Sequence, residues 1–70
     1  MKIRFYEVPT KESTFGDEEF LIEVYTERVP SVGECVGFEE FGDCYDVVNT
    51  STWFHDKERA MYEILIVKRV

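Results

Sequence analysis

The chain has 70 residues, of which 15 are Asp or Glu and 8 are Lys or Arg, so its formal net charge is −7 at neutral pH. This charge repels nucleic-acid phosphates and anionic membranes at long range, and it disfavours nonspecific binding to either. A chain this short forms one domain, residues 1–70, with a small core. Six Phe, four Tyr and one Trp supply the apolar area for that core.

The N-terminal stretch MKIRFYEVPT lacks the apolar run of a secretory signal, and the sequence has no run of ~20 apolar residues that could cross a bilayer. We therefore expect a cytoplasmic protein without a membrane partner. In a reducing compartment, Cys35 and Cys44 are expected to be free thiols, buried where they pack beside the core.

Apolar and polar residues alternate with a period of two in several segments, which predicts half-buried strands, and no window carries a helical stripe. The first strand is expected at residues 2–8, where Pro9 ends it, and the second at 20–28, after a polar loop. Pro30 and Gly33 then turn the chain.

A third strand is expected at 34–38, with Gly37 relieving crowding where the sheet curls, and a fourth at 44–48 after a turn at Gly42-Asp43. The polar run NTST interrupts the fourth strand and predicts a bulge or bend. The last strand, 60–70, is expected to be the longest.

Five short strands in 70 residues predict an all-β domain. A flat sheet would leave one face uncovered and both edges open, so we expect a five-stranded antiparallel small barrel or a strongly curled sheet.

The last strand carries apolar residues on both faces. If Tyr62, Ile64 and Ile66 face the core, Leu65 and Val67 lie on the opposite face. Either the loop after Pro9 covers these two residues, or they form an exposed patch for self-association or for a protein partner.

The sequence contains no arrangement of residues that predicts catalysis, a cofactor or a metal. The chain has a single histidine, and His55, Asp56 and Glu58 fit a solvated turn better than a metal site. Cys35 and Cys44 would pair directly if the turn were centred on Glu39-Glu40, but a turn at Gly42-Asp43 moves them apart. We therefore predict a protein that is not an enzyme.

Charge is unevenly distributed along the chain. Residues 17–46 hold ten acids and one base, a local net charge of −9 that includes Glu39, Glu40 and Asp43. Such a surface is either a soluble face or an imitation of nucleic-acid charge that inhibits a host nuclease or defence complex. Four bases flank the two ends of the chain and would form one basic patch if the terminal strands were neighbours: Lys2, Arg4, Lys68 and Arg69.

Six aromatic residues could offer a stacking platform to single-stranded nucleic acid, although such platforms normally lie in a basic groove. Packing in or beside the core is the stronger interpretation for them: Tyr6, Tyr25, Tyr45, Trp53, Phe54 and Tyr62. A nucleic-acid-binding small barrel is therefore only a second alternative.

One set of residues follows the pattern PxxGExVxF, then YxV, then W: Pro30, Gly33, Glu34, Val36, Phe38, Tyr45, Val47 and Trp53. This pattern resembles that of small SH3-like β-barrel proteins, many of them uncharacterised products of phages and other mobile elements. The resemblance implies a fold and a genomic setting, and it transfers no catalytic residues. The sequence as a whole favours a non-enzymatic protein-interaction module, with Leu65, Val67, Glu39, Glu40 and Asp43 as candidate contact residues.

Overall fold

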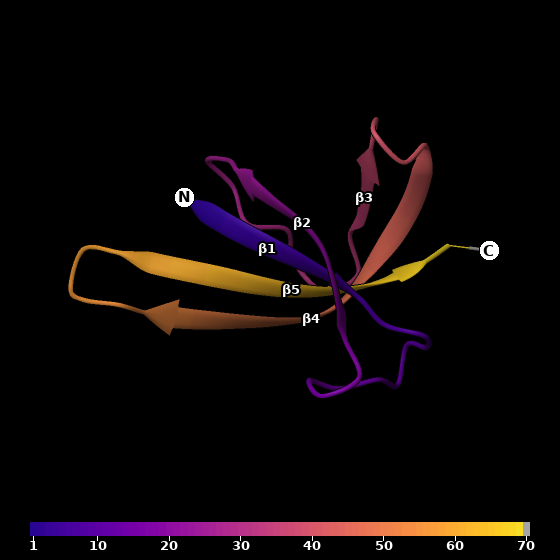
Figure 1. The fold of residues 1–70 in the computed structure, drawn as a ribbon, viewed down its shortest axis with the longest axis horizontal. Helices are drawn as coiled ribbons and strands as arrows, with labels where there is room; N and C mark the ends of the chain where they lie inside the picture. The colour runs from indigo at the N-terminus through magenta and orange to yellow at the C-terminus, as the bar shows by residue number, and fades with distance from the viewer. Residues whose placement is uncertain (70) are drawn as a thin grey trace.

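The computed structural model describes residues 1–69, which contain five strands and no helix (Figure 1). The strands are β1 (Lys2–Glu7), β2 (Glu19–Tyr25), β3 (Cys35–Phe38), β4 (Asp43–Phe54) and β5 (Ala60–Lys68). They form one sheet in the order β2-β1-β5-β4-β3, which curls strongly into a half-barrel. The prediction of an all-β, five-stranded, strongly curled sheet is confirmed.

The sheet is mixed, however, and not purely antiparallel as expected. β1 and β5 run parallel, in a register from Lys2 opposite Met61 to Glu7 opposite Ile66, whereas the other three pairs are antiparallel. Alternation of side chains has the same period in both kinds of pair, so the sequence pattern cannot show the direction of pairing. A parallel central strand is normally buried on both faces, which accounts for the run ILIV in β5.

The core lies on the concave face of the sheet. Its fully buried residues come from β1, β4 and β5: Ile3, Phe5, Tyr45, Val47, Ile64 and Ile66. Phe38 from β3 closes one end, with its ring edge-to-face with that of Phe5 at a centroid distance of 5.0 Å. Burial of these side chains stabilises the curl of the sheet, because it brings Phe38 of β3 against Phe5 of β1.

Leu65 lies on the opposite, convex face of β5 and is nevertheless fully buried, with 0% of its surface exposed. Val8 is also buried, and its backbone N–H extends the β1–β5 pairing by donating to the carbonyl of Ile66 at 2.9 Å. Val67 is half-buried. The structure thus favours the covered arrangement of these two residues over an exposed patch.

Strand boundaries differ most from the prediction in β2 and β4. β2 ends at Tyr25 and not at residue 28, and β4 continues through the NTST run to Phe54, which makes β4 the longest strand. The expected irregularity is a bulge at Val48, where the β4–β5 register shifts. Val70, the expected end of the last strand, lies outside the described residues.

The turn between β3 and β4 occupies residues 39–42. Its centre lies between the two centres considered from sequence, Glu39-Glu40 and Gly42-Asp43. Gly42 has a φ of +71°, which favours glycine there. A Cβ at Gly37 would approach no closer than 3.9 Å to the Asp43 carbonyl oxygen and the Cys44 Sγ. The expectation that Gly37 relieves crowding is therefore wrong.

The β4–β5 hairpin projects beyond the other strands (Figure 1). β3 pairs only with Asp43 to Asp46 of β4, whereas the β4–β5 pairing continues to Phe54 opposite Ala60. The molecule is correspondingly long, with extents of 39 × 26 × 19 Å.

Candidate interaction surface

The projecting part of β4, residues 49–54, has a partner on one side only. β5 pairs with it throughout, and β3 does not reach it. The last backbone contacts on the outer side are at Val47, which donates to the Glu34 carbonyl at 2.8 Å and accepts from Gly33 N–H at 2.9 Å. We call the outer side of residues 49–54 the distal edge.

The bulge at Val48 decides which backbone groups point outward from the distal edge. Before the bulge, the backbone groups of Val47 point away from β5. Beyond the bulge, the N–H of His55 donates to the carbonyl of Arg59 within the hairpin. The backbone groups of odd-numbered residues from 49 to 55 therefore point toward β5. Thr50, Thr52 and Phe54 therefore present their N–H and C=O groups to the open side. The Thr50 N–H is capped by the Asn49 Oδ1 at 2.9 Å.

The distal edge lies within the longest stretch of the sequence without Asp, Glu, Lys or Arg, residues 47–55. Its end carries two exposed aromatic side chains, Trp53 (55% exposed) and Phe54 (76% exposed). Pairing places Trp53 beside Met61 on the convex face and Phe54 beside Ala60 on the concave face. An unpaired strand edge without charge, flanked by exposed aromatics, is suited to accept another strand.

The other two edges of the sheet carry charges that oppose such pairing. β2 contains Glu19 and Glu23, while β3 has only four residues and lies between Glu34 and the exposed Glu39. Short edge strands and charged side chains are features that protect sheets from intermolecular pairing. The distal edge has neither.

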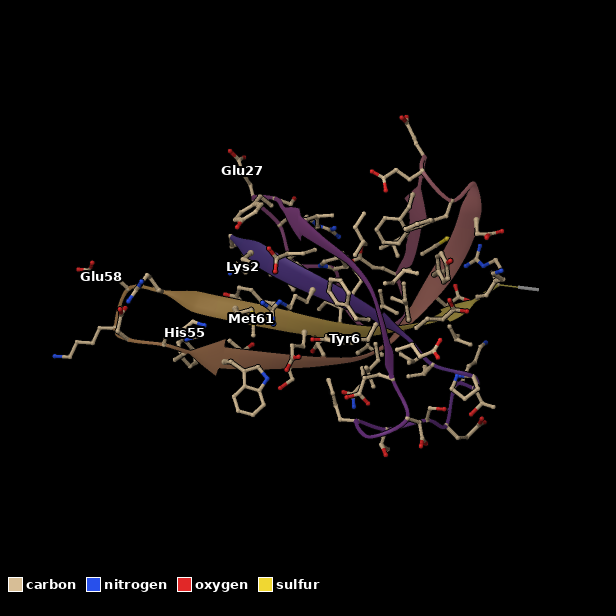
Figure 2. The ribbon with its side chains drawn as sticks, in the orientation of Figure 1. Lys2, Tyr6, Glu27, His55, Glu58 and Met61 are labelled. Carbon is tan, nitrogen blue, oxygen red and sulfur yellow. The ribbon has the colours of Figure 1, made fainter. Side chains whose placement is uncertain are left out.

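A hollow of about 590 Å³ lies between the start of β1 and the tip of the β4–β5 hairpin. Figure 2 labels Lys2, His55, Glu58 and Met61, four of its lining residues, at this projecting end. The hollow is open, and its charged and apolar lining residues come from the start of β1, the hairpin turn and the start of β5.

His55 and Asp56 lie in the exposed turn of this hairpin. Asp56 accepts hydrogen bonds from the backbone N–H groups of Glu58 and Arg59, both at 2.9 Å, and forms an ion pair with the Arg59 guanidinium. The backbone bond from Glu58 and the bonds from Arg59 lower the pKa of Asp56. The Asp56 carboxylate is thus occupied in shaping the turn.

The contact residues expected from sequence do not lie on one surface. Leu65 is buried, and Val67 pairs with Asp46 beside the Asp46–Arg69 ion pair. Glu39 and Glu40 are exposed in the β3–β4 turn, but Asp43 forms an ion pair with Lys68 at 3.3 Å. Of the three acidic residues predicted as contacts, only Glu39 and Glu40 are therefore free of ion pairs among residues 1–69.

The four terminal bases do not form one patch. β1 and β5 are neighbours as the patch required, but their parallel direction puts Lys2 and Arg4 beside Met61 and Glu63, away from Lys68. Arg4 Nε is bound to Glu23 at 2.8 Å, and Lys68 and Arg69 are bound to Asp43 and Asp46, three ion pairs in all. The parallel direction of β1 and β5 thus separates the four bases into two groups, and ion pairs neutralise three of them.

Cys35 and Cys44 are exposed free thiols on the convex face of the β3–β4 hairpin, so the expectation of buried packing thiols is wrong. Cys35 lies opposite Asp46, and Cys44 lies opposite Gly37, which makes the two cysteines diagonal neighbours. The nearby Arg69 has a raised pKa, chiefly because it donates to Asp46. The thiols thus lie beside an ion pair and outside the apolar core.

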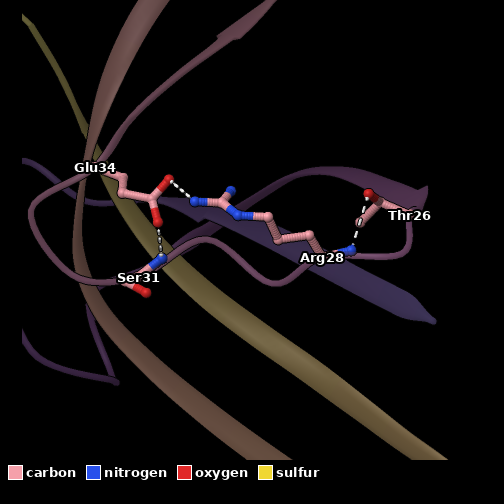
Figure 3. A network of polar contacts seen from close by, with 4 residues as sticks. All are labelled: Thr26, Arg28, Ser31 and Glu34. Carbon is pink, nitrogen blue, oxygen red and sulfur yellow. Dashed lines mark hydrogen bonds and ion pairs between the residues drawn. The ribbon is translucent and has the colours of Figure 1, made fainter.

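A polar network fixes the segment that joins β2 to β3 (Figure 3). Glu34 accepts from the Arg28 guanidinium at 2.5 Å and from the Ser31 backbone N–H at 2.9 Å, and both contacts lower its pKa. The neighbouring Pro30 is buried. Residues 29–34 therefore form an ordered connection from β2 to β3, and Gly33 and Glu34 bond to the outer side of β4 at Val47.

Sequence reasoning missed the distal edge because the NTST run was interpreted as an interruption of a strand. The signal that could have found it is the absence of charge from residues 47–55 in a chain of net charge −7.

Comparisons with protein-family models, with curated protein sequences and with solved structures gave no match. Within residues 1–69 there is no helix that is long and apolar enough to cross a membrane.

Proposed function

We propose that this chain is a non-enzymatic, cytoplasmic protein-interaction module whose contact surface is the distal edge of β4. The observation that carries the proposal is the row of outward backbone groups at Thr50, Thr52 and Phe54, which have no β-strand partner among residues 1–69 and lie in the uncharged stretch 47–55. Strand addition to such an edge obtains affinity from main-chain hydrogen bonds, and Trp53 and Phe54 supply apolar contacts.

A substitution at Thr52 tests the edge directly. Its N–H faces outward, so Thr52→Pro removes an edge donor and leaves the β4–β5 hydrogen bonds in place. Thr52→Val keeps the N–H and serves as the matched control. In affinity capture from the native host, we expect partners that bind the wild type and Thr52→Val but not Thr52→Pro. Capture that is indifferent to the proline contradicts the proposal.

An acidic mimic that inhibits a nuclease or defence complex is the second candidate. Its support is the exposed pair Glu39 and Glu40, together with a second acidic site where Glu7 lies opposite Glu19. This candidate predicts binding to a basic protein that weakens as salt is added and is lost on reversing Glu39, Glu40 and Asp43. Nucleic-acid binding has less support because three of the four terminal bases are in ion pairs.

Assignment to the SH3-like barrels of phages and other mobile elements stays a proposal as well. Its support is the residue pattern from Pro30 to Trp53, of which Val36, Phe38, Tyr45 and Val47 contribute to the core. A determined structure of a related chain with a known genomic setting would test it.

A further inference from the structure

We infer that the partner at the distal edge is a second copy of this chain, bound through antiparallel β4–β4 pairing about a twofold axis at Thr52. This inference rests on the proposed function, because it assigns the occupant of the same edge. The result would be a continuous ten-stranded sheet, closed as a dimer because each copy contributes the one unprotected edge of its residues 1–69.

The register follows from the backbone directions. The outward-facing residues are Thr50, Thr52 and Phe54, so the symmetric arrangement that uses all three places Thr52 opposite its own counterpart and Thr50 opposite Phe54 of the other copy. Each of these residues then exchanges backbone hydrogen bonds with the residue that faces it. Only Thr50 must first release its N–H from Asn49.

Charge restricts self-association of this acidic chain to the distal edge. Two chains of net charge −7 repel each other, and pairing through β2 would bring its glutamates into the contact. In the register centred on Thr52, residues 49–55 of the two copies face each other, and this segment contains no Asp, Glu, Lys or Arg. Added salt screens the remaining repulsion, so self-association should strengthen with salt, in contrast to binding by an acidic mimic.

Charge exchange at Thr52 tests the twofold axis. Thr52→Glu and Thr52→Lys each place two like charges opposite one another in the dimer, and a mixture of the two variants places opposite charges there. Thr52 is exposed, so both variants should fold, which circular dichroism verifies. Thr14→Glu and Thr14→Lys are matched controls, because Thr14 is an exposed threonine in the β1–β2 connection.

Light scattering across a concentration series should give a dimer for the wild type and for both Thr14 variants. The dissociation constant should rise at least tenfold in each Thr52 variant and recover in the equimolar mixture. A wild type that stays monomeric at high salt overturns the inference, as does a dimer that neither Thr52 charge weakens. Loss of the dimer without recovery in the mixture also overturns it, because Thr52 would then not face its counterpart.

These outcomes are distinct from failure of the proposed function. If the pure chain is monomeric and yet the affinity capture recovers a partner that Thr52→Pro loses, the edge binds a different protein, and only the second-copy inference fails. If neither experiment responds to Thr52, both proposals fail.

Discussion

Ile64 and Leu65 are consecutive residues of β5 that lie on opposite faces of the sheet, and neither exposes any surface. β5 is therefore packed from both sides in a domain of only 70 residues. Small domains bury a limited fraction of their surface, so the convex face contributes stability that the concave core alone lacks.

Replacement of Leu65 by alanine should therefore reduce stability and not merely affect self-association. Truncating a buried leucine costs about 2–5 kcal/mol, a large part of the stability of a small domain. Urea unfolding monitored by circular dichroism measures the change. Val67→Ala, at a half-buried position of the same face, is the control and should cost less. Equal, small effects of both substitutions would show that the convex face is not packed as described.

Asn49 should restrain the distal edge, because its Oδ1 occupies the Thr50 N–H at 2.9 Å. Asn49→Ala frees this donor in each copy of the inferred dimer. A hydrogen bond contributes about 1 kcal/mol net, so two bonds should tighten the dimer by roughly tenfold or more. Sedimentation equilibrium measures the dissociation constant. Weaker dimerisation by Asn49→Ala would mean that Asn49 is itself a contact residue.

Gly42→Ala and Gly37→Ala should differ although both glycines lie in the β3–β4 hairpin. Gly42 has a φ of +71°, where a side chain costs about 1 kcal/mol or more, whereas an added Cβ at Gly37 meets only ordinary contacts at 3.9 Å. Thermal unfolding should show a lower Tm for Gly42→Ala than for Gly37→Ala. The reverse order would place the strain of this hairpin in its strands and not in its turn.

The Asp46–Arg69 ion pair should make stability depend on pH in the acidic range. The hydrogen bond from Arg69 lowers the pKa of Asp46, so the pair stabilises the folded state above the unfolded pKa of about 4 and loses this effect as the pH falls through the lower, folded value. The difference in free energy of unfolding between wild type and Asp46→Asn should therefore shrink between about pH 5 and pH 2. Arg69→Gln should behave in the same way; a difference that persists in acid contradicts the assignment.

Cys35 and Cys44 should both react with a thiol reagent in the folded protein, because both are exposed. They should not form an intramolecular disulfide, since diagonal cross-strand positions are about 7–8 Å apart and disulfides seldom span more than about 6.8 Å between Cα atoms. Mass spectrometry after labelling without reductant should find two labels per chain. A chain with none would require a different β3–β4 register.

The strands could be predicted from sequence because alternation marks them directly, as in Lys2–Glu7 and Ala60–Lys68. The parallel pairing of these two strands could not, because direction depends on contacts between the two ends of the chain. The burial of Leu65 could not be predicted either. An apolar residue on the second face of a strand can be covered by the same chain or exposed to bind a partner protein.

The distal edge was hidden for a related reason. Asn, Ser and Thr are common in turns, so the NTST run suggested a break, but the bulge at Val48 lets β4 continue with its outward residues changed by one position. Which backbone groups remain free depends on this single extra residue. Of the predicted contact residues, Glu39 and Glu40 are exposed, and the others are covered or in ion pairs.

The position of β5 between β1 and β4 has a consequence for how the chain folds. β1 and β2 form one antiparallel pair, β3 and β4 another, and only β5 joins them. The loop between β1 and β5 spans nearly the whole chain, and closing such a loop is entropically costly before its contacts form. We therefore expect slow, cooperative folding in which β1 reaches its final place only after β5 has formed. Removal of β5 should leave the β1–β2 and β3–β4 hairpins without a strand that joins them.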